Sequence, residues 1–551
     1  MTADTPTPLS EGVWRAPDGD VWELDSAHGT GVVPVPLRGE LEDAFAEGFR
    51  RSFAQLGMPL SHIELRHVNG RPYVSFFLHD VPRKAGPPPP ALVLKILTRV
   101  HPGFRRRTRI ARAALAERRP ERWVEDWFDE RQSWIDRIID LQSADPTDMT
   151  DDELARHLQQ VADLATKGLQ RHFELVPGCI PLGRWLAQAE TWGLRPDRAR
   201  AAVMHGTPVH DEARQRIKRV ADALGEATPT DFDQIRSHSA EAAAALDDYL
   251  AHHGRWATRD ELGSPQVRAF PGAVIGSIQA QRQNGGAVEA STAPATEEII
   301  EELRAQIPPG DRDGLDRLTR DAHRAYQMLD DNSGILGSWL LGVTGELFHA
   351  AGKRLTDVGR LHDSDHVWAL QLGDIVALLQ GHSPLTADQA GEHYRAWRAL
   401  DRLEPPPHLN GPPTPPPDPS VFPPPVSQLV TAVTTFLSDK FNYSNEAIGI
   451  GTRTVRGRAV VAVDASDAIS RIEPGDIVVT AATTPAYNTI LPIVTGIVVS
   501  EGGPSCHAAV VARELDLPAI VGYANAPTSI PDGAIIELDP TMATVTILSG
   551  P

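Results

Sequence analysis

The sequence has very little cysteine and no long apolar run. Cys179 and Cys506 are the only cysteines among 551 residues, which excludes a disulfide framework and favours a reducing, cytoplasmic location. No stretch of about 18 apolar residues is present, so we predict no transmembrane helix and no membrane partner. The opening residues, MTADTPTPLSEGVW, lack the basic start and apolar core of a secretory signal.

Positive charge is also scarce. The chain has 53 Lys and Arg against 73 Asp and Glu, a net charge of −20. A field of this sign repels phosphate backbones, so we expect no nucleic-acid partner. The 41% of hydrophobic residues suffices for sizeable cores, and wholesale disorder is therefore not expected.

Proline, in contrast, is abundant and unevenly spread. Twelve of the 47 prolines fall between Pro405 and Pro425. Proline lacks an amide proton and fixes φ, so this segment predicts an extended, semi-rigid polyproline spacer and neither a helix nor an interior strand. We therefore expect two domains, residues 1–402 and 427–551, joined by a proline-rich linker at 403–426.

The periodicity of apolar residues differs on the two sides of this linker. Before it, β-rich runs flank Asn69-Gly70, a hairpin signal, and from about Pro102 onward the spacing is helical, as in Leu154, Leu158 and Val161. After it, short β-branched runs alternate with Gly, Pro and Asp, interrupted by one helical stretch at 507–515. The predicted fold is a large mainly α-helical domain followed by a compact α/β domain.

The segment with the clearest chemical signal is EGGPSCHAAVVAREL, residues 501–515. Gly502 and Gly503 end a strand and permit a tight turn, Ser505 is a favourable helix N-cap, and His507 then lies in the first helical turn. Free amide protons and the helix dipole favour a neutral histidine there and could hold a phosphoryl group on its ring. An ordinary helix start with an exposed histidine fits the same spacing.

This segment resembles the phosphohistidine swivelling domain of the phosphoenolpyruvate-utilising enzymes, and Ser505 replaces that family's threonine. The resemblance covers roughly residues 445–550 and includes the PGDIVV and TTPAY segments upstream. The matching positions of the motif are Gly502, Gly503, Cys506, His507, Ala508, Ala509, Ala512, Arg513, Pro518, Ala519, Val521 and Gly522.

The resemblance implies a β/β/α swivelling domain whose His507 carries a phosphoryl group, with Gly502, Gly503, Ser505, Cys506 and Arg513 around it. It implies a phosphotransferase of the dikinase type that transfers the group to a small organic acceptor. No segment resembles the family's ATP-grasp domain, so ATP and Mg²⁺ are expected on a separate nucleotide-binding subunit, with no tightly bound cofactor and no metal site here. Two alternatives stay open: phosphoryl-activated condensation or dehydration in natural-product biosynthesis, and a non-catalytic phosphocarrier.

The helical region has weaker, ordered similarities to the substrate domain of the rifampin phosphotransferase branch of that family. They lead us to expect that residues in the first 402 positions bind the acceptor. The predicted set, each member of which could instead be an ordinary capping or core residue, comprises Asp25, His28, His252, His253, Arg255, Asp260 and Glu261.

A cluster of arginines stands out in this acidic chain. Arg105, Arg106, Arg107, Arg109 and Arg112 follow one another within eight residues. Such a run can receive a phosphorylated substrate, a nucleotide or an acidic partner, or can form a solvated helix face.

Overall fold

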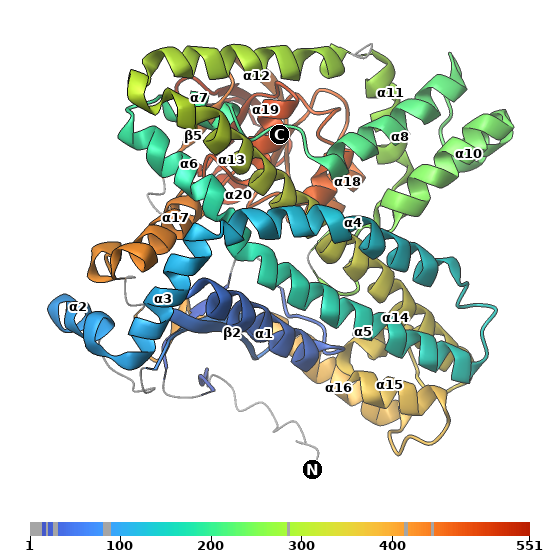
Figure 1. The fold of residues 1–551 in the computed structure, drawn as a ribbon. Helices are drawn as coiled ribbons and strands as arrows, with labels where there is room; N and C mark the ends of the chain where they lie inside the picture. Colours follow the sequence, from blue (N-terminus) through green and yellow to red (C-terminus); the bar gives the residue numbers. More distant parts are fainter. Residues whose placement is uncertain are drawn as a thin grey trace.

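The computed structural model describes residues 14–17, 20–25, 31–80, 90–259, 261–283, 287–412, 417–441 and 446–550. It confirms the predicted fold class, a large helical region followed by a C-terminal mixed sheet (Figure 1). The helices before the C-terminal sheet are α1 Arg38–Leu56, α2 Ala91–Val100, α3 Pro102–Ala116, α4 Arg119–Ser143, α5 Asp151–Leu175, α6 Ile180–Thr191, α7 Pro196–Ala201, α8 Pro208–Leu224, α9 Phe232–His238, α10 Ala240–Tyr249, α11 Pro271–Gln283, α12 Ala287–Gln306, α13 Arg312–Asn332, α14 Leu340–Asp357, α15 Leu372–Leu379, α16 Ala387–Ala399 and α17 Pro424–Phe441.

A small antiparallel sheet lies beside the first helices. Its strands are β1 Trp22–Leu24, β2 Leu60–Val68, β3 Arg71–Leu78 and β4 His408–Leu409, in the order β2-β3-β1-β4. The predicted hairpin is confirmed: Val68 pairs with Arg71, and Asn69 and Gly70 both have positive φ, as a tight two-residue turn requires.

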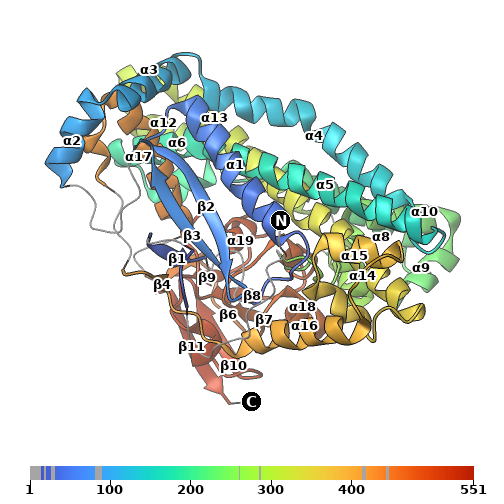
Figure 2. The ribbon, with the colours of Figure 1, turned by 90° about the horizontal axis from the view of Figure 1, so that it is seen from below.

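The C-terminal part is built on a seven-stranded sheet in the order β11-β10-β6-β7-β8-β9-β5. Strands β6 to β9 are parallel, and the outer strands are antiparallel to their neighbours. Figure 2 shows this sheet on one side of the molecule and the long helices α1, α4 and α5 on the other. Its elements are β5 Ile448–Ile450, β6 Val455–Val461, α18 Ala465–Arg471, β7 Ile477–Thr480, β8 Gly496–Val499, α19 His507–Glu514, β9 Ala519–Val521, α20 Ala526–Ser529, β10 Ile535–Asp539 and β11 Thr544–Ser549.

The described parts of the proline-rich segment include a short strand and a helix start, which the prediction of an extended, semi-rigid spacer did not include. Residues 408–409 pair with β1 as an edge strand, and the hydroxyl of Tyr73 donates to the carbonyl of Pro406 (2.9 Å). Pro424 and Pro425 open α17, where the first turn has no need of their amide protons. The described parts of the segment are therefore anchored to the helical region, and the expected boundary at 426–427 lies inside α17.

Helix α17 joins the two parts of the molecule. Leu429 and Ala432 are buried among residues of α1, α3 and α6, and Phe436 belongs to the main helical core. The backbone of α6 comes so close that a Cβ on Gly183 would lie 1.9 Å from the carbonyl oxygen of Ala432. The C-terminal end of α17 then contacts the loop before α19, which positions the site described next.

Candidate functional site

The loop before α19 is fixed by glycine conformation and by α17. Gly502 has φ of +96°, and a Cβ there would come within 2.7 Å of the Cβ of Cys506, so this position requires glycine. The amide of Gly503 donates to the carbonyl of Lys440 (2.8 Å), and the amide of Ser505 donates to that of Asp439 (3.3 Å). Strand β8 thus ends in a turn tied to the last residues of α17.

The helix begins one residue later than predicted. The N-cap of α19 is Cys506, which makes no side-chain capping bond, and His507 is the first helical residue. Ser505 lies just outside the helix, and its hydroxyl donates to the carboxylate of Asp439 instead of capping α19. Burial raises the pKa of the Cys506 thiol, which therefore stays protonated at neutral pH.

His507 is held through one ring nitrogen, and its other nitrogen has no partner. Nδ1 lies 2.9 Å from the hydroxyl oxygen of Thr483, and Nε2 is buried without a hydrogen-bond partner in the described part of the chain. Burial lowers the pKa of His507 to about 4, although the Asp330 carboxylate opposes the shift. A neutral ring with Nδ1–H donated to Thr483 leaves the lone pair of Nε2 free to act as a nucleophile.

Arg513 supports the loop from the next turn of α19. Its guanidinium donates to the carbonyl of Pro504 (2.7 Å). Burial lowers its pKa to about 10, and the nearby charge of Arg200 adds to this effect. The group remains charged at neutral pH and braces the backbone just before His507.

One face of α19 packs against the helical region. His507, Val510 and Glu514 follow helical spacing, and Val510 belongs to the same core cluster as the helical region. Glu514 Oε2 lies 3.5 Å from Nδ1 of His210, in the first turn of α8. The histidine predicted to carry chemistry therefore faces α8 and α13 and not open solvent.

His210 lies between two carboxylates beneath this face. Its Nε2 is 3.4 Å from Oδ2 of Asp330, and its ring centre is 6.3 Å from that of His507. Burial acts to lower the pKa of His210, but the charges of Asp330 and Glu514 outweigh it and raise the pKa to about 9. A buried imidazolium thus stands beside a neutral His507.

Several buried polar atoms at this contact have no hydrogen-bond partner among the described residues. They are Nε2 of His507, Oδ1 of Asn488, Oε1 of Glu514 and the hydroxyl of Tyr326. Asn488 Nδ2 lies 2.7 Å from His210 Nε2, and exchanging the two amide atoms would let Oδ1 accept from the charged ring. Buried polar atoms are normally satisfied, so the remaining ones mark a place that a phosphoryl group or an acceptor can occupy.

The residues predicted to bind an acceptor are not brought into one cavity. Glu261 lines a cavity of about 200 Å³ with Trp368 and Trp397, whereas Arg255 lines another of about 340 Å³ and pairs with Glu346 (2.7 Å).

The other predicted acceptor residues are dispersed as well. Asp25 follows β1, where its amide donates to the carbonyl of Pro72 (3.0 Å), and Nδ1 of His252 donates to the carbonyl of Asp248 (2.8 Å). His28 and Asp260 lie outside the described residues.

His253 is buried. Burial lowers its pKa far below the ordinary value, and the charge on His210 contributes to this shift.

Sequence reasoning missed the groups that face His507. His210 and Asp330 are distant along the chain, and only the folded helices bring them together. Glu514 had a usable signal, because it lies seven residues after His507 and so on the same helical face. Among the described residues, no group of three or more His, Cys, Asp or Glu side chains is arranged to hold a metal ion, and none of the described helices is long and apolar enough to cross a bilayer.

Comparisons with known proteins agree with the motif. Residues 472–542 match the family described as PEP-utilising enzyme, mobile domain. Over 342 residues the chain is 28% identical to rifampicin phosphotransferase of Streptomyces sviceus. This aligned region covers 56% of this chain and 35% of that protein. Over 328 residues it is 29% identical to chondramide synthase of Chondromyces crocatus, covering 55% of this chain and 8% of the synthase.

The match to phosphoenolpyruvate synthase of Escherichia coli is shorter but has a higher identity. It is 43% identical over 88 residues, 16% of this chain and 11% of that enzyme. The chain thus spans about a third or less of the length of these relatives. The match over residues 472–542 and these similarities together support the resemblance of the chain to the PEP-utilising enzymes.

Proposed function

We propose that this chain is a phosphotransferase of the dikinase type in which His507 carries the phosphoryl group. The observation that carries the proposal is the free, buried Nε2 of a neutral His507, held by Thr483 in a loop that matches the family motif. In charging, the Nε2 lone pair forms a P–N bond while the donor's bond to phosphorus breaks. In transfer, the acceptor oxygen forms a P–O bond, the P–N bond breaks, Nε2 regains its lone pair, and a nearby carboxylate takes the acceptor's proton.

The contact between α19 and the helical region is the place where we expect the acceptor to react. His210 supplies a positive charge there, and Asp330 supplies a carboxylate that can take a proton from an acceptor hydroxyl. Tyr326 and Asn488 add polar atoms that lack partners within the described part of the chain. The acceptor is a small organic molecule in this proposal, and its identity is set by the helical region.

The phosphoryl donor is proposed to be bound by another subunit. Transfer from ATP requires cationic side chains and Mg²⁺ around the polyphosphate, and we assign ATP and Mg²⁺ to that partner. The two cysteines are unpaired, which supports placing the protein in the cytoplasm.

A second function is favoured by one comparison. The similarity to chondramide synthase supports a role in natural-product biosynthesis, where the phosphorylated acceptor would be consumed in a condensation or dehydration. A phosphocarrier without acceptor chemistry is the remaining alternative, and detection of a phosphorylated product would exclude it.

Chemical phosphorylation tests the carrier without any partner. Phosphoramidate donates its phosphoryl group to histidine nitrogen with release of ammonia, and the product is stable in alkali and labile in acid. We expect a phosphoryl group on the peptide that contains His507 in the wild type, none on that peptide in His507→Ala, and unchanged labelling of that peptide in His362→Ala, which removes an exposed histidine. The measurement is peptide mass spectrometry with ³¹P NMR, and a wild type in which the His507 peptide stays unlabelled while other histidines react would overturn the assignment.

A further inference from the structure

Helix α2 lies at the edge of the molecule (Figures 1 and 2) and carries exposed aliphatic side chains, which we call the ridge. Leu92, Val93, Ile96 and Val100 are 70%, 51%, 54% and 63% exposed. Large aliphatic side chains gathered in this way on one short helix mark an interaction surface more often than isolated exposed residues do. Because α2 lies at the edge of the molecule, the ridge can enter a groove on another molecule.

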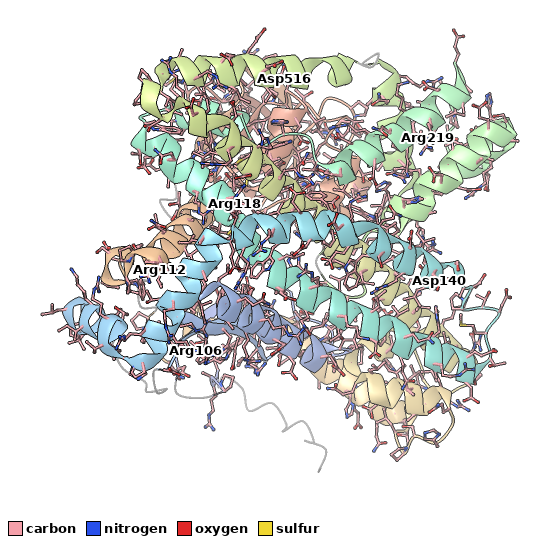
Figure 3. All side chains as sticks on the ribbon, viewed as in Figure 1. Arg106, Arg112, Arg118, Asp140, Arg219 and Asp516 are labelled. Carbon is pink, nitrogen blue, oxygen red and sulfur yellow. The ribbon has the colours of Figure 1, made fainter. Side chains whose placement is uncertain are left out.

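The next helix adds positive charge to the ridge. Residues 90–116 contain seven Lys and Arg and no Asp or Glu, in a chain whose net charge is −20. Arg105, Arg106, Arg109 and Arg112 are exposed on α3, and none makes an ion pair within the described part of the chain. Figure 3 labels Arg106 and Arg112 on this helix. We call these four arginines and the four aliphatic residues of α2 the α2–α3 surface.

The charge of the α2–α3 surface restricts what can cover it. In a symmetric dimer through this patch, four unpaired arginines would face four others, and like charges brought together are unfavourable. A face of opposite charge is complementary, and arginine beside aliphatic side chains is a composition typical of protein interfaces. The surface therefore fits a different protein that presents acidic residues around an apolar groove.

The α2–α3 surface is also connected to the loop that holds His507. The hydroxyl of Thr98 and the guanidinium of Arg99 both donate to the carbonyl of Val421 (3.0 and 2.8 Å), just before α17. Helix α17 is 18 residues long, about 27 Å at the usual rise per residue. Near its other end, the carbonyl of Lys440 accepts a hydrogen bond from the amide of Gly503. A protein bound at this surface would stand beside the segment that links the mobile domain to the helical region.

We propose that the α2–α3 surface is the docking site of the subunit that donates the phosphoryl group, and that this subunit has an acidic face with an apolar groove. The inference rests on the proposed function, since it names where the donor of His507 binds. A donor bound at this position is held close to the segment that leads into the C-terminal domain. This raises the effective concentration of the donor site near His507.

The docking site is tested by measuring transfer of the phosphoryl group from ATP to His507, because capture of a binding protein alone would not identify the donor. Source-cell extract is fractionated for the activity that moves label from ATP, labelled in its β- and γ-phosphates, to His507 of the intact chain. The variants are Ile96→Asp and the double variant Arg105→Glu, Arg109→Glu. The matched controls are Val358→Asp and Arg320→Glu, which change exposed residues of the helical region outside the α2–α3 surface.

We expect both surface variants to need at least about tenfold more donor for half-maximal labelling, a loss of about 1.4 kcal/mol in binding. The controls should behave like the wild type, and added salt should weaken transfer to the wild type because the contact is electrostatic. Labelling of all variants by phosphoramidate should be unchanged, which shows that His507 and the fold are intact.

Three results would overturn the docking site. In the first, the donor labels wild type and surface variants equally. In the second, no fraction of the extract transfers label to the wild type. In the third, the surface variants are labelled normally but no longer bind phosphatidylglycerol vesicles that the wild type binds. The last result would assign the surface to a membrane. If phosphoramidate fails to label His507, the proposed function is wrong. If phosphoramidate labels His507 normally and the donor transfers equally to wild type and surface variants, only the docking site is wrong.

Discussion

At the scale of single residues, the enclosure of His507 predicts a dependence of stability on pH. Its pKa is about 4 in the folded protein against an ordinary 6.5, so between these values the unfolded chain binds a proton that the folded chain does not. The free energy of unfolding therefore has its full value above pH 6.5 as far as His507 is concerned. It decreases as the pH falls toward 4, by at most about 1.4 kcal/mol per pH unit. The advantage in melting temperature of the wild type over His507→Asn should therefore shrink between pH 7.5 and 5. A constant difference over this range would mean that His507 titrates freely.

The site illustrates which residues a sequence can reveal. The local motif identified His507, since glycines, a histidine and a helical stretch occur at fixed spacing within a few residues. It misplaced the N-cap by one residue, because the hydroxyl of Ser505 bonds Asp439, a residue of α17 that no local pattern indicates. His210 and Asp330 reach the site only through the packing of α8 and α13 against α19.

At the scale of elements, the close contact of α6 with α17 predicts that Gly183 cannot be replaced. A Cβ at this position would lie 1.9 Å from a backbone oxygen of α17, which cannot move as a side chain can. Gly183→Ala should therefore destabilise the protein by about 1–3 kcal/mol, in the range of overpacked cores. The measurement is urea unfolding monitored by fluorescence.

The matched control is Gly314→Ala, in the first turn of α13. A Cβ there would meet nothing within 4 Å, and alanine is favoured over glycine in helices by up to about 1 kcal/mol. This variant should be neutral or slightly stabilising. If both variants unfold alike, the approach of α6 to α17 is looser than the structure describes.

Helix α17 also shows why the elements were predicted unevenly. Strong local signals, such as Asn69-Gly70 and the spacing of Leu154 and Leu158, specified the hairpin and α5 correctly. The prolines before α17 were interpreted as a spacer, although proline is tolerated in a first helical turn and here opens an 18-residue helix. Weaker patterns do not reveal breaks: Ser239 separates α9 from α10, and the chain then forms a π turn at Leu250–Gly254.

At the scale of the whole molecule, a modest set of contacts holds the mobile domain on the helical region. The hydroxyls of Thr258 and Ser466 lie 2.6 Å apart, and Arg259 pairs with Asp464 (3.2 Å). The ion pair of His210 with Glu514 is the most enclosed of these contacts. Polar contacts of this kind are each worth little in net free energy, which is compatible with the proposed movement of this domain between two sites.

The charge of His210 makes this docking dependent on pH in the alkaline range. Its pKa is about 9, raised by Asp330 on α13 and Glu514 on α19 against burial and the opposing charge of Arg214 on α8. Asp330 stays beside His210 when the domain leaves, so only the part of the raised pKa that Glu514 causes favours the docked state. This contribution is present at neutral pH and is lost as the pH rises through 9. Between pH 7.5 and 10 we expect the mobile domain to separate, with a larger radius of gyration in X-ray scattering and faster labelling of His507 by phosphoramidate. Glu514→Gln should label faster already at pH 7.5 and change less with pH, whereas equal profiles for wild type and variant would show that this ion pair does not hold the domain in place.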